Sequence, residues 1–126
     1  MKSEAKIQNE VRARLNNSKL LRLYRNNTGQ TPLPCPGCFI QLCGRCEGKY
    51  RRPIKFGLAV GSADLIGFTR FGRFISVEIK TDKGKLSKEQ IIWMKLVKEW
   101  GGIARVIRSV AEADAFLKEL EDEEVR

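Results

Sequence analysis

The chain has 126 residues, no histidine, and 24 Lys and Arg against 15 Asp and Glu, which gives a formal net charge of +9. This length suits one domain with a single core. No run approaches the roughly 18 apolar residues of a membrane span, which argues against a membrane protein. The chain opens into a helical pattern without an apolar signal segment, so we expect a soluble, intracellular protein.

The positive charge is unevenly distributed along the chain. Residues 1–111 hold 22 Lys and Arg against 8 Asp and Glu, a balance of +14, whereas residues 112–126 hold 2 against 7, a balance of −5. A strongly basic body is expected of a protein that binds a polyanion such as DNA, although basic surfaces also serve solubility alone.

The N-terminal region predicts a helix followed by a strand. Over residues 4–17, apolar side chains recur every four positions, the spacing of an amphipathic helix. These side chains are Ile7, Val11 and Leu15. Residues 20–26 predict a strand, and the NNTG sequence at 26–29 is typical of a turn.

Residues 30–53 predict a long loop, because they contain all four prolines and all four cysteines of the chain. The cysteines form two CxxC pairs, at Cys35, Cys38, Cys43 and Cys46. Two such pairs can supply four thiolates to Zn²⁺, although the four residues between them make a tight closure. Disulfides fit less well in a reducing cell, and the strand–helix setting of a thioredoxin-like motif is lacking. We therefore expect a structural zinc ion that orders this loop.

Basic residues follow and flank the cysteines, and they make this loop a candidate for phosphate contacts. They are Arg45, Lys49, Arg51, Arg52 and Lys55. A short extended segment is expected next, at residues 54–58.

A β-hairpin is predicted by residues 65–69 and 73–79, which are rich in Leu, Ile, Phe, Val and Thr. The three-residue turn between them ends in Gly72, where a turn of this length needs a left-handed residue. Centring the turn on its middle residue places Asp64 directly opposite Glu78. Residues so paired have Cβ atoms roughly 4.5–5.5 Å apart.

Asp64, Glu78 and Lys80 place three charges at the ends of two apolar strands. Burying a charge is costly unless it is paired or coordinates a metal. Glu78 and Lys80 are two residues apart on one strand, so they share a face of the sheet. Two facing carboxylates beside a lysine suit a divalent cation and an attacking water. The alternative is a structural pair that Lys80 alone neutralises.

The C-terminal half predicts two capped helices around a strand. The SKEQ sequence at 87–90 matches a capping box, and the helix that it opens should reach about Trp100 and end at the two glycines that follow. Residues 103–108 predict a strand. A second capping box, SVAE at 109–112, opens a final helix that runs into an acidic tail at 119–126.

The predicted fold class is therefore α/β, with a small central mixed sheet flanked by helices. We expect residues 1–126 to form one domain with the Cys-rich loop as an insertion.

Six segments together resemble one known family. They read EAKIQ (4–8), RNNTG (25–29), GSADLIG (61–67), EIK (78–80), LSKEQ (86–90) and WGGIARVI (100–107). They look like the virus-type replication-repair nuclease (VRR-NUC) domain of the PD-(D/E)XK superfamily, and the first two resemble its stand-alone phage and prophage members. Ala63 stands where the superfamily name has proline, a position that supplies no ligand.

The resemblance implies metal-dependent phosphodiester hydrolysis on a PD-(D/E)XK nuclease fold. Carried over to this chain, Asp64 and Glu78 would hold Mg²⁺ or Mn²⁺, and Glu4 would complete the metal site. Lys80 would orient or activate the attacking water, and Gln90 would line the site. Hard divalent cations of this kind take oxygen ligands and are often held by one or two carboxylates plus substrate phosphate.

Several of these residues have a structural alternative. Gln90 also stands where a capping box needs it. Glu4 competes with Glu10 for the role of the helix-borne carboxylate, and Glu4 is preferred because its spacing matches the family pattern. Arg25 and Asn26 either contact the DNA backbone or only shape the turn that follows them.

The resemblance to stand-alone phage members further implies a homodimer that acts on branched DNA, such as Holliday junctions, in the cytoplasm of a bacterial host. One alternative is a nicking, flap or restriction-like nuclease on other DNA. Another is a non-catalytic, zinc-stabilised DNA-binding module.

Overall fold

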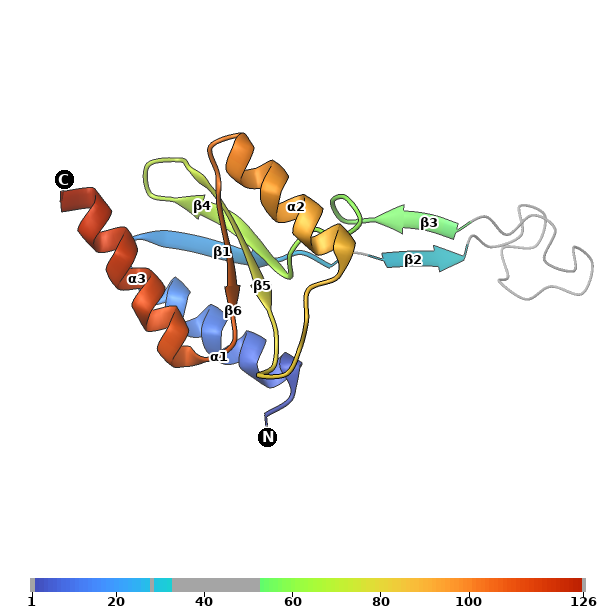
Figure 1. Ribbon diagram of the computed structural model, residues 1–126, viewed down its shortest axis with the longest axis horizontal. Coiled ribbons are helices and arrows are strands. Elements are labelled where there is room, and N and C mark those ends of the chain that lie inside the picture. The colour runs from blue at the N-terminus through green and yellow to red at the C-terminus, as the bar shows by residue number, and fades with distance from the viewer. Residues whose placement is uncertain (1, 28, 33–52, 126) are drawn as a thin grey trace, which may run out of the picture. The chain divides into compact units, whose positions relative to one another are not determined.

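The computed structural model describes residues 2–27, 29–32 and 53–125. The chain divides into two compact units, one formed by residues 1–26 and 60–126 and the other by residues 27–59. Figure 1 labels the helices and strands of both units. The four cysteines and the zinc site predicted for them lie outside the described residues.

The larger unit is built on a four-stranded sheet in the order β1-β4-β5-β6. Its strands are β1 (Leu21–Arg25), β4 (Leu65–Thr69), β5 (Phe74–Ile79) and β6 (Ile103–Ile107). Strand β4 pairs antiparallel with both β1 and β5, whereas β5 and β6 run parallel. The predicted α/β fold with a small mixed sheet is therefore confirmed.

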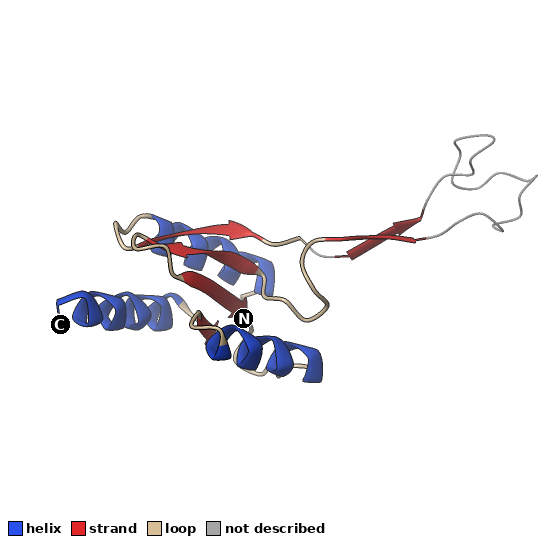
Figure 2. Cartoon of the chain, turned by 90° about the horizontal axis from the view of Figure 1, so that it is seen from above, coloured by secondary structure: helices blue, strands red, loops and turns tan. Residues whose placement is uncertain are grey.

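Helices lie on both faces of this sheet, as Figure 2 shows. They are α1 (Glu4–Asn16), α2 (Lys88–Glu99) and α3 (Val110–Val125). On one face, α1 and α3 pack against each other and cover the core, while α2 packs against β5 and β6 on the other. The three apolar residues that predicted α1 are all buried in this core. Within the described residues, no helix is long and apolar enough to cross a membrane.

The β4–β5 hairpin has the predicted register. Leu65 pairs with Val77 and Phe68 pairs with Phe74. Gly72 has a φ of 83°, the left-handed conformation that the turn requires. Continuing this register by one residue places Asp64 opposite Glu78, which positions the site described below.

The ends of the predicted loop form a ribbon, so the expectation of a loop over all of residues 30–53 is wrong at its ends. Strand β2 (Gly29–Pro32) pairs antiparallel with β3 (Pro53–Phe56). Prolines 32 and 53 argued against strands here, but each stands at the end of its strand, where proline is tolerated. The predicted division into one domain with an inserted Cys-rich loop stays a prediction.

The final helix begins with only half of the predicted capping box. The Ser109 hydroxyl accepts a hydrogen bond from the Glu112 N–H at 3.2 Å, as expected. The Glu112 carboxylate, however, accepts from the N–H of Arg108, one residue before the cap, at 2.6 Å. The helix continues to Val125, so the acidic tail is mainly helical, and its Glu119 pairs with Arg105 at 2.8 Å.

Candidate metal centre

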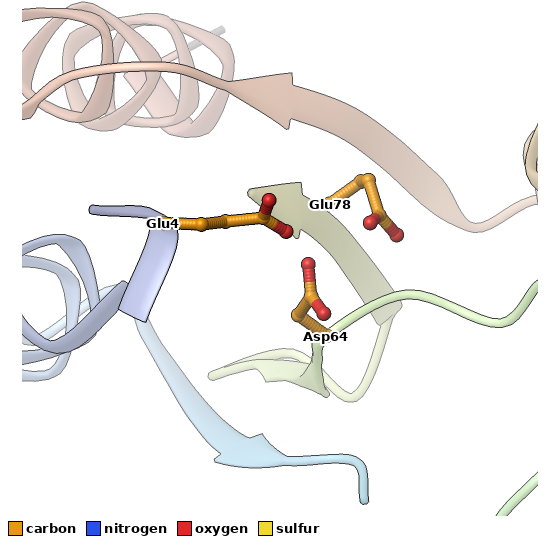
Figure 3. Close-up of side chains that lie close together, drawn as sticks. All are labelled: Glu4, Asp64 and Glu78. Carbon is orange, nitrogen blue, oxygen red and sulfur yellow. The ribbon is translucent and has the colours of Figure 1, made fainter. Parts of the chain in front are cut away.

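Three carboxylates from separate parts of the sequence meet at one end of the sheet. Glu4 begins α1, Asp64 precedes β4, and Glu78 lies near the end of β5. One oxygen of each lies within 4.8 Å of one oxygen of both others. Figure 3 shows Glu4 reaching from its helix toward the other two. Glu10, the competing residue, instead forms an ion pair with Lys2 at 2.7 Å. The packing of α1 thus brings Glu4, the preferred candidate, to the other two.

Asp64 is held in place through both its side chain and its backbone. One of its carboxylate oxygens accepts a hydrogen bond from the Ile79 N–H at 2.9 Å. Its carbonyl accepts from the Asn26 N–H at 2.8 Å. The Asn26 side-chain amide also donates to Ser62 Oγ at 2.8 Å and to the Ala63 carbonyl at 2.9 Å. Asn26 therefore shapes the segment that presents Asp64. The sequence alone could not predict this role, because Asn26 and Ser62 are 36 residues apart.

Gly61 permits a close approach between this segment and α2. Its φ is 85°, and a Cβ added there would lie 2.5 Å from the backbone of Glu89. Any larger residue would therefore push the Asp64 segment and the beginning of α2 apart. The glycine at the start of GSADLIG is thus required by both conformation and packing.

Glu78 is the most buried member of the cluster, with 3% of its surface exposed. Burial, reinforced by the neighbouring Asp64 carboxylate, raises the pKa of Glu78 to about 8, against the opposing effect of Lys80. The Lys80 ammonium lies 3.8 Å from Glu78 Oε1. A divalent cation would oppose this rise in pKa, because its positive charge favours the ionised carboxylate.

Gln90 connects this cluster to the beginning of α2. Its side-chain oxygen accepts from the Ser87 N–H at 2.8 Å, while its backbone N–H donates to Ser87 Oγ at 3.2 Å. The side-chain nitrogen of Gln90 donates to Glu78 Oε1 at 3.0 Å. The predicted capping box is confirmed, and its glutamine also contacts the cluster. The cap holds the amide in the orientation that reaches Glu78.

In a comparison with protein-family models, the VRR-NUC domain matches residues 3–111. The chain belongs to the VRR-NUC family. This match covers most of the chain and includes all five predicted site residues outside the cysteine loop. No curated protein matches the chain significantly. VRR-NUC domains are nucleases of the PD-(D/E)XK type, which implies DNA as the substrate.

The carboxylate cluster fits the metal that a VRR-NUC nuclease requires. Mg²⁺ binds oxygens at roughly 2.0–2.1 Å, so two oxygens on one ion lie about 3 to 4 Å apart. The oxygens of Glu4, Asp64 and Glu78 lie within 4.8 Å, and small side-chain movements would bring them into this range. The donor set is all oxygen, as a hard cation prefers.

Replacing Gln90 with alanine should lower cleavage by about tenfold, since partners that orient metal ligands typically contribute 10–100-fold. It should also destabilise the fold by about 1 kcal/mol through loss of the bond that the Gln90 side chain accepts from the Ser87 N–H. Glu112→Ala is the matched control, because the Glu112 side chain also accepts a backbone N–H bond before its helix, from Arg108, and lies at the beginning of α3 outside the carboxylate cluster. Cleavage rates and urea denaturation of both variants test this. Equal losses of cleavage would assign Gln90 a purely structural role.

Proposed function

We propose that this protein is a Mg²⁺- or Mn²⁺-dependent endonuclease that hydrolyses phosphodiester bonds in branched DNA, such as Holliday junctions. The observation that carries the proposal is the meeting of Glu4, Asp64 and Glu78 beside Lys80. A non-catalytic DNA-binding module would have no need for carboxylates at this position, because they repel phosphate.

Each residue of the cluster has a distinct part in the proposed reaction. Asp64 and Glu78 would hold the ion, and Glu4 would complete its protein ligands. The bound ion would polarise the phosphate and lower the pKa of the attacking water. Lys80, whose side chain is 14% exposed, lies where it can orient that water and stabilise the developing negative charge. Gln90 fixes Glu78 through its hydrogen bond.

A homodimer follows from the proposed branched substrate, because symmetric cutting of a junction needs two active sites. One chain offers one carboxylate cluster among its described residues, whereas resolving a junction requires two incisions related by a dyad. A two-fold homodimer supplies them. An exposed apolar stripe along α2 and the residue that caps its C-terminus offers a surface for such self-association. Its residues, spaced four apart, are Ile92, Leu96 and Trp100, and their exposed fractions are 56%, 45% and 84%.

The resemblance to stand-alone phage members supports the same substrate and a site of action in the cytoplasm of a bacterial host. Because the family resemblance carries this part of the proposal, it needs a direct test on DNA of different shapes.

A cleavage panel tests the proposal: four-way junction, flap, nicked and plain duplex DNA, each with Mg²⁺, Mn²⁺ or EDTA. We expect metal-dependent, symmetric cutting of the junction at least about tenfold faster than cutting of the plain duplex, in line with a discrimination of about 1.4 kcal/mol. Equal cutting of all four would move the assignment to a nicking or restriction-like nuclease. Binding without cutting on every DNA would indicate a non-catalytic module.

A further inference from the structure

Aromatic side chains stand exposed on the sheet face that carries the carboxylates. They are Tyr24 of β1, Phe68 of β4 and Phe74 of β5, with exposed fractions of 54%, 48% and 37%, and the ring of Phe74 also meets that of Trp93 of α2 edge-on, with centroids 6.4 Å apart. The rings of Tyr24 and Phe68 have centroids 6.3 Å apart. We call these three residues the aromatic platform. Large apolar side chains gathered on an exposed face are typical of a binding surface.

Strand pairing and alternation place the aromatic platform beside the metal centre. On β1, Leu21 and Leu23 are buried under α1, so Tyr24 faces the opposite side of the sheet. On β5, Phe74 shares a face with Glu78, four residues along the strand.

Cross-strand pairs arrange these residues in successive rows. Phe68 pairs with Phe74 in one row, and Tyr24 pairs with Ile66 in the next. The row of Asp64 and Glu78 follows. Rows on one face lie about 7 Å apart. The nearest ring of the aromatic platform therefore lies about as far from the carboxylates as two stacked bases extend.

The charges around the aromatic platform suit a nucleic acid. Strands β1, β4 and β5 contain one acidic residue, Glu78 of the metal centre. Arg22 pairs with Phe68 on the platform's face of the sheet and is exposed, while the exposed Arg25 follows Tyr24 on β1 and alternates to the other face. The apolar stripe along α2, by contrast, has neighbours of both charges, Lys95 and Glu99. An aromatic surface with basic neighbours is the combination that binds unpaired nucleotides, because rings stack on bases while cations meet the backbone.

We propose that the aromatic platform stacks unpaired bases next to the phosphate that is cut, so that the preferred substrate has unpaired nucleotides at the cleavage position. This inference rests on the proposed nuclease function and narrows its branched substrate to branches at which bases are unpaired, such as a flap or a junction whose central bases have opened. In a continuous duplex, both faces of each base are covered by neighbours. Only a base freed at a branch, flap or end can stack on Tyr24 or Phe68.

Binding measurements on two matched DNAs test this inference. One is a flap with normal unpaired nucleotides near the branch, and the other has abasic sites at those positions. Dissociation constants are measured by fluorescence anisotropy in EDTA at one fixed salt concentration. Tyr24→Leu and Phe68→Leu remove a ring but keep an apolar side chain in the sheet. Phe71→Leu is the matched control, because Phe71 is 73% exposed in the β4–β5 turn, outside the platform.

Each platform variant should bind the normal flap about tenfold more weakly than the wild type and bind the abasic flap equally well. Phe71→Leu should behave as the wild type, and Tyr24→Phe, which keeps the ring, should retain base-dependent affinity. Unchanged binding of the normal flap would overturn the inference, as would equal losses on both DNAs. So would conversion of a dimer into monomers by the platform variants in light scattering, since that assigns the face to a second copy of the chain.

Failure of this inference is distinguishable from failure of the nuclease proposal. If no DNA is cut with Mg²⁺ or Mn²⁺, the nuclease proposal fails, whatever the binding results. If DNA is cut but the variants show no dependence on bases, only the aromatic platform is rejected.

Discussion

Glu78→Gln is expected to abolish cleavage while leaving DNA binding within about twofold of the wild type. The substitution keeps the size of the side chain and an oxygen that can accept from Gln90, but removes the negative charge that a metal ligand needs. Metal-ion catalysis contributes several kcal/mol of transition-state stabilisation, and each 1.4 kcal/mol is tenfold in rate. We therefore expect a loss of about 10³-fold or more, measured by single-turnover cleavage of junction DNA.

A matched pair of helix variants extends this experiment to the third carboxylate. Glu4→Gln and Glu10→Gln each remove one negative charge from α1, but only Glu4 lies in the carboxylate cluster. Cleavage should fall with Glu4→Gln and persist with Glu10→Gln. Cleavage by the Glu78→Gln variant at the rate of the wild type would refute the assignment of the metal centre.

The metal-free protein should lose stability as the pH rises from about 5 to about 8. Glu78 has a folded-state pKa of about 8, raised from its ordinary value of 4.5 by burial and by Asp64. Between these values the folded state binds one more proton than the unfolded state. The free energy of unfolding therefore falls with rising pH, by at most about 1.4 kcal/mol per pH unit. The stabilisation is fully present below the unfolded pKa and is lost as pH passes the folded pKa.

Urea denaturation in EDTA at a series of pH values measures this effect. Other groups titrate in the same range, so the informative quantity is the difference between the wild type and Glu78→Gln, which lacks the carboxyl. That difference should shrink or change sign as pH rises. Mg²⁺ should stabilise the wild type more at pH 8 than at pH 6, since binding requires the ionised carboxylate. Parallel stability curves would show that Glu78 titrates normally.

The hairpin and the glutamine cap were predictable because their signals are local. Alternation of apolar residues and one left-handed glycine, Gly72, fix the register that sets Asp64 opposite Glu78. A four-residue capping box fixes the position of Gln90.

Long-range packing was harder to predict. Approach of Glu4 to the sheet depends on how α1 docks, and only the family pattern favoured it over Glu10. The contact of Asn26 with Ser62 joins residues that no periodicity relates. Strand β2 was missed, and the extended segment expected at residues 54–58 overlaps β3 without its beginning or its pairing, because the prolines at positions 32 and 53 were weighed without their partner strands.

The hydrogen bonds of Asn26 have a consequence for how this chain can evolve. Residues 27–59 leave the larger unit beside Asn26 and re-enter it just before Ser62, and these two residues are bonded to each other. The hydrogen bond between Asn26 and Ser62 therefore holds together the two points at which residues 27–59 join the larger unit. The cost of closing a loop grows only slowly with its length. This position can accept an insertion of another size or composition while Asp64 keeps its place, which makes it a natural point for acquiring new binding specificity.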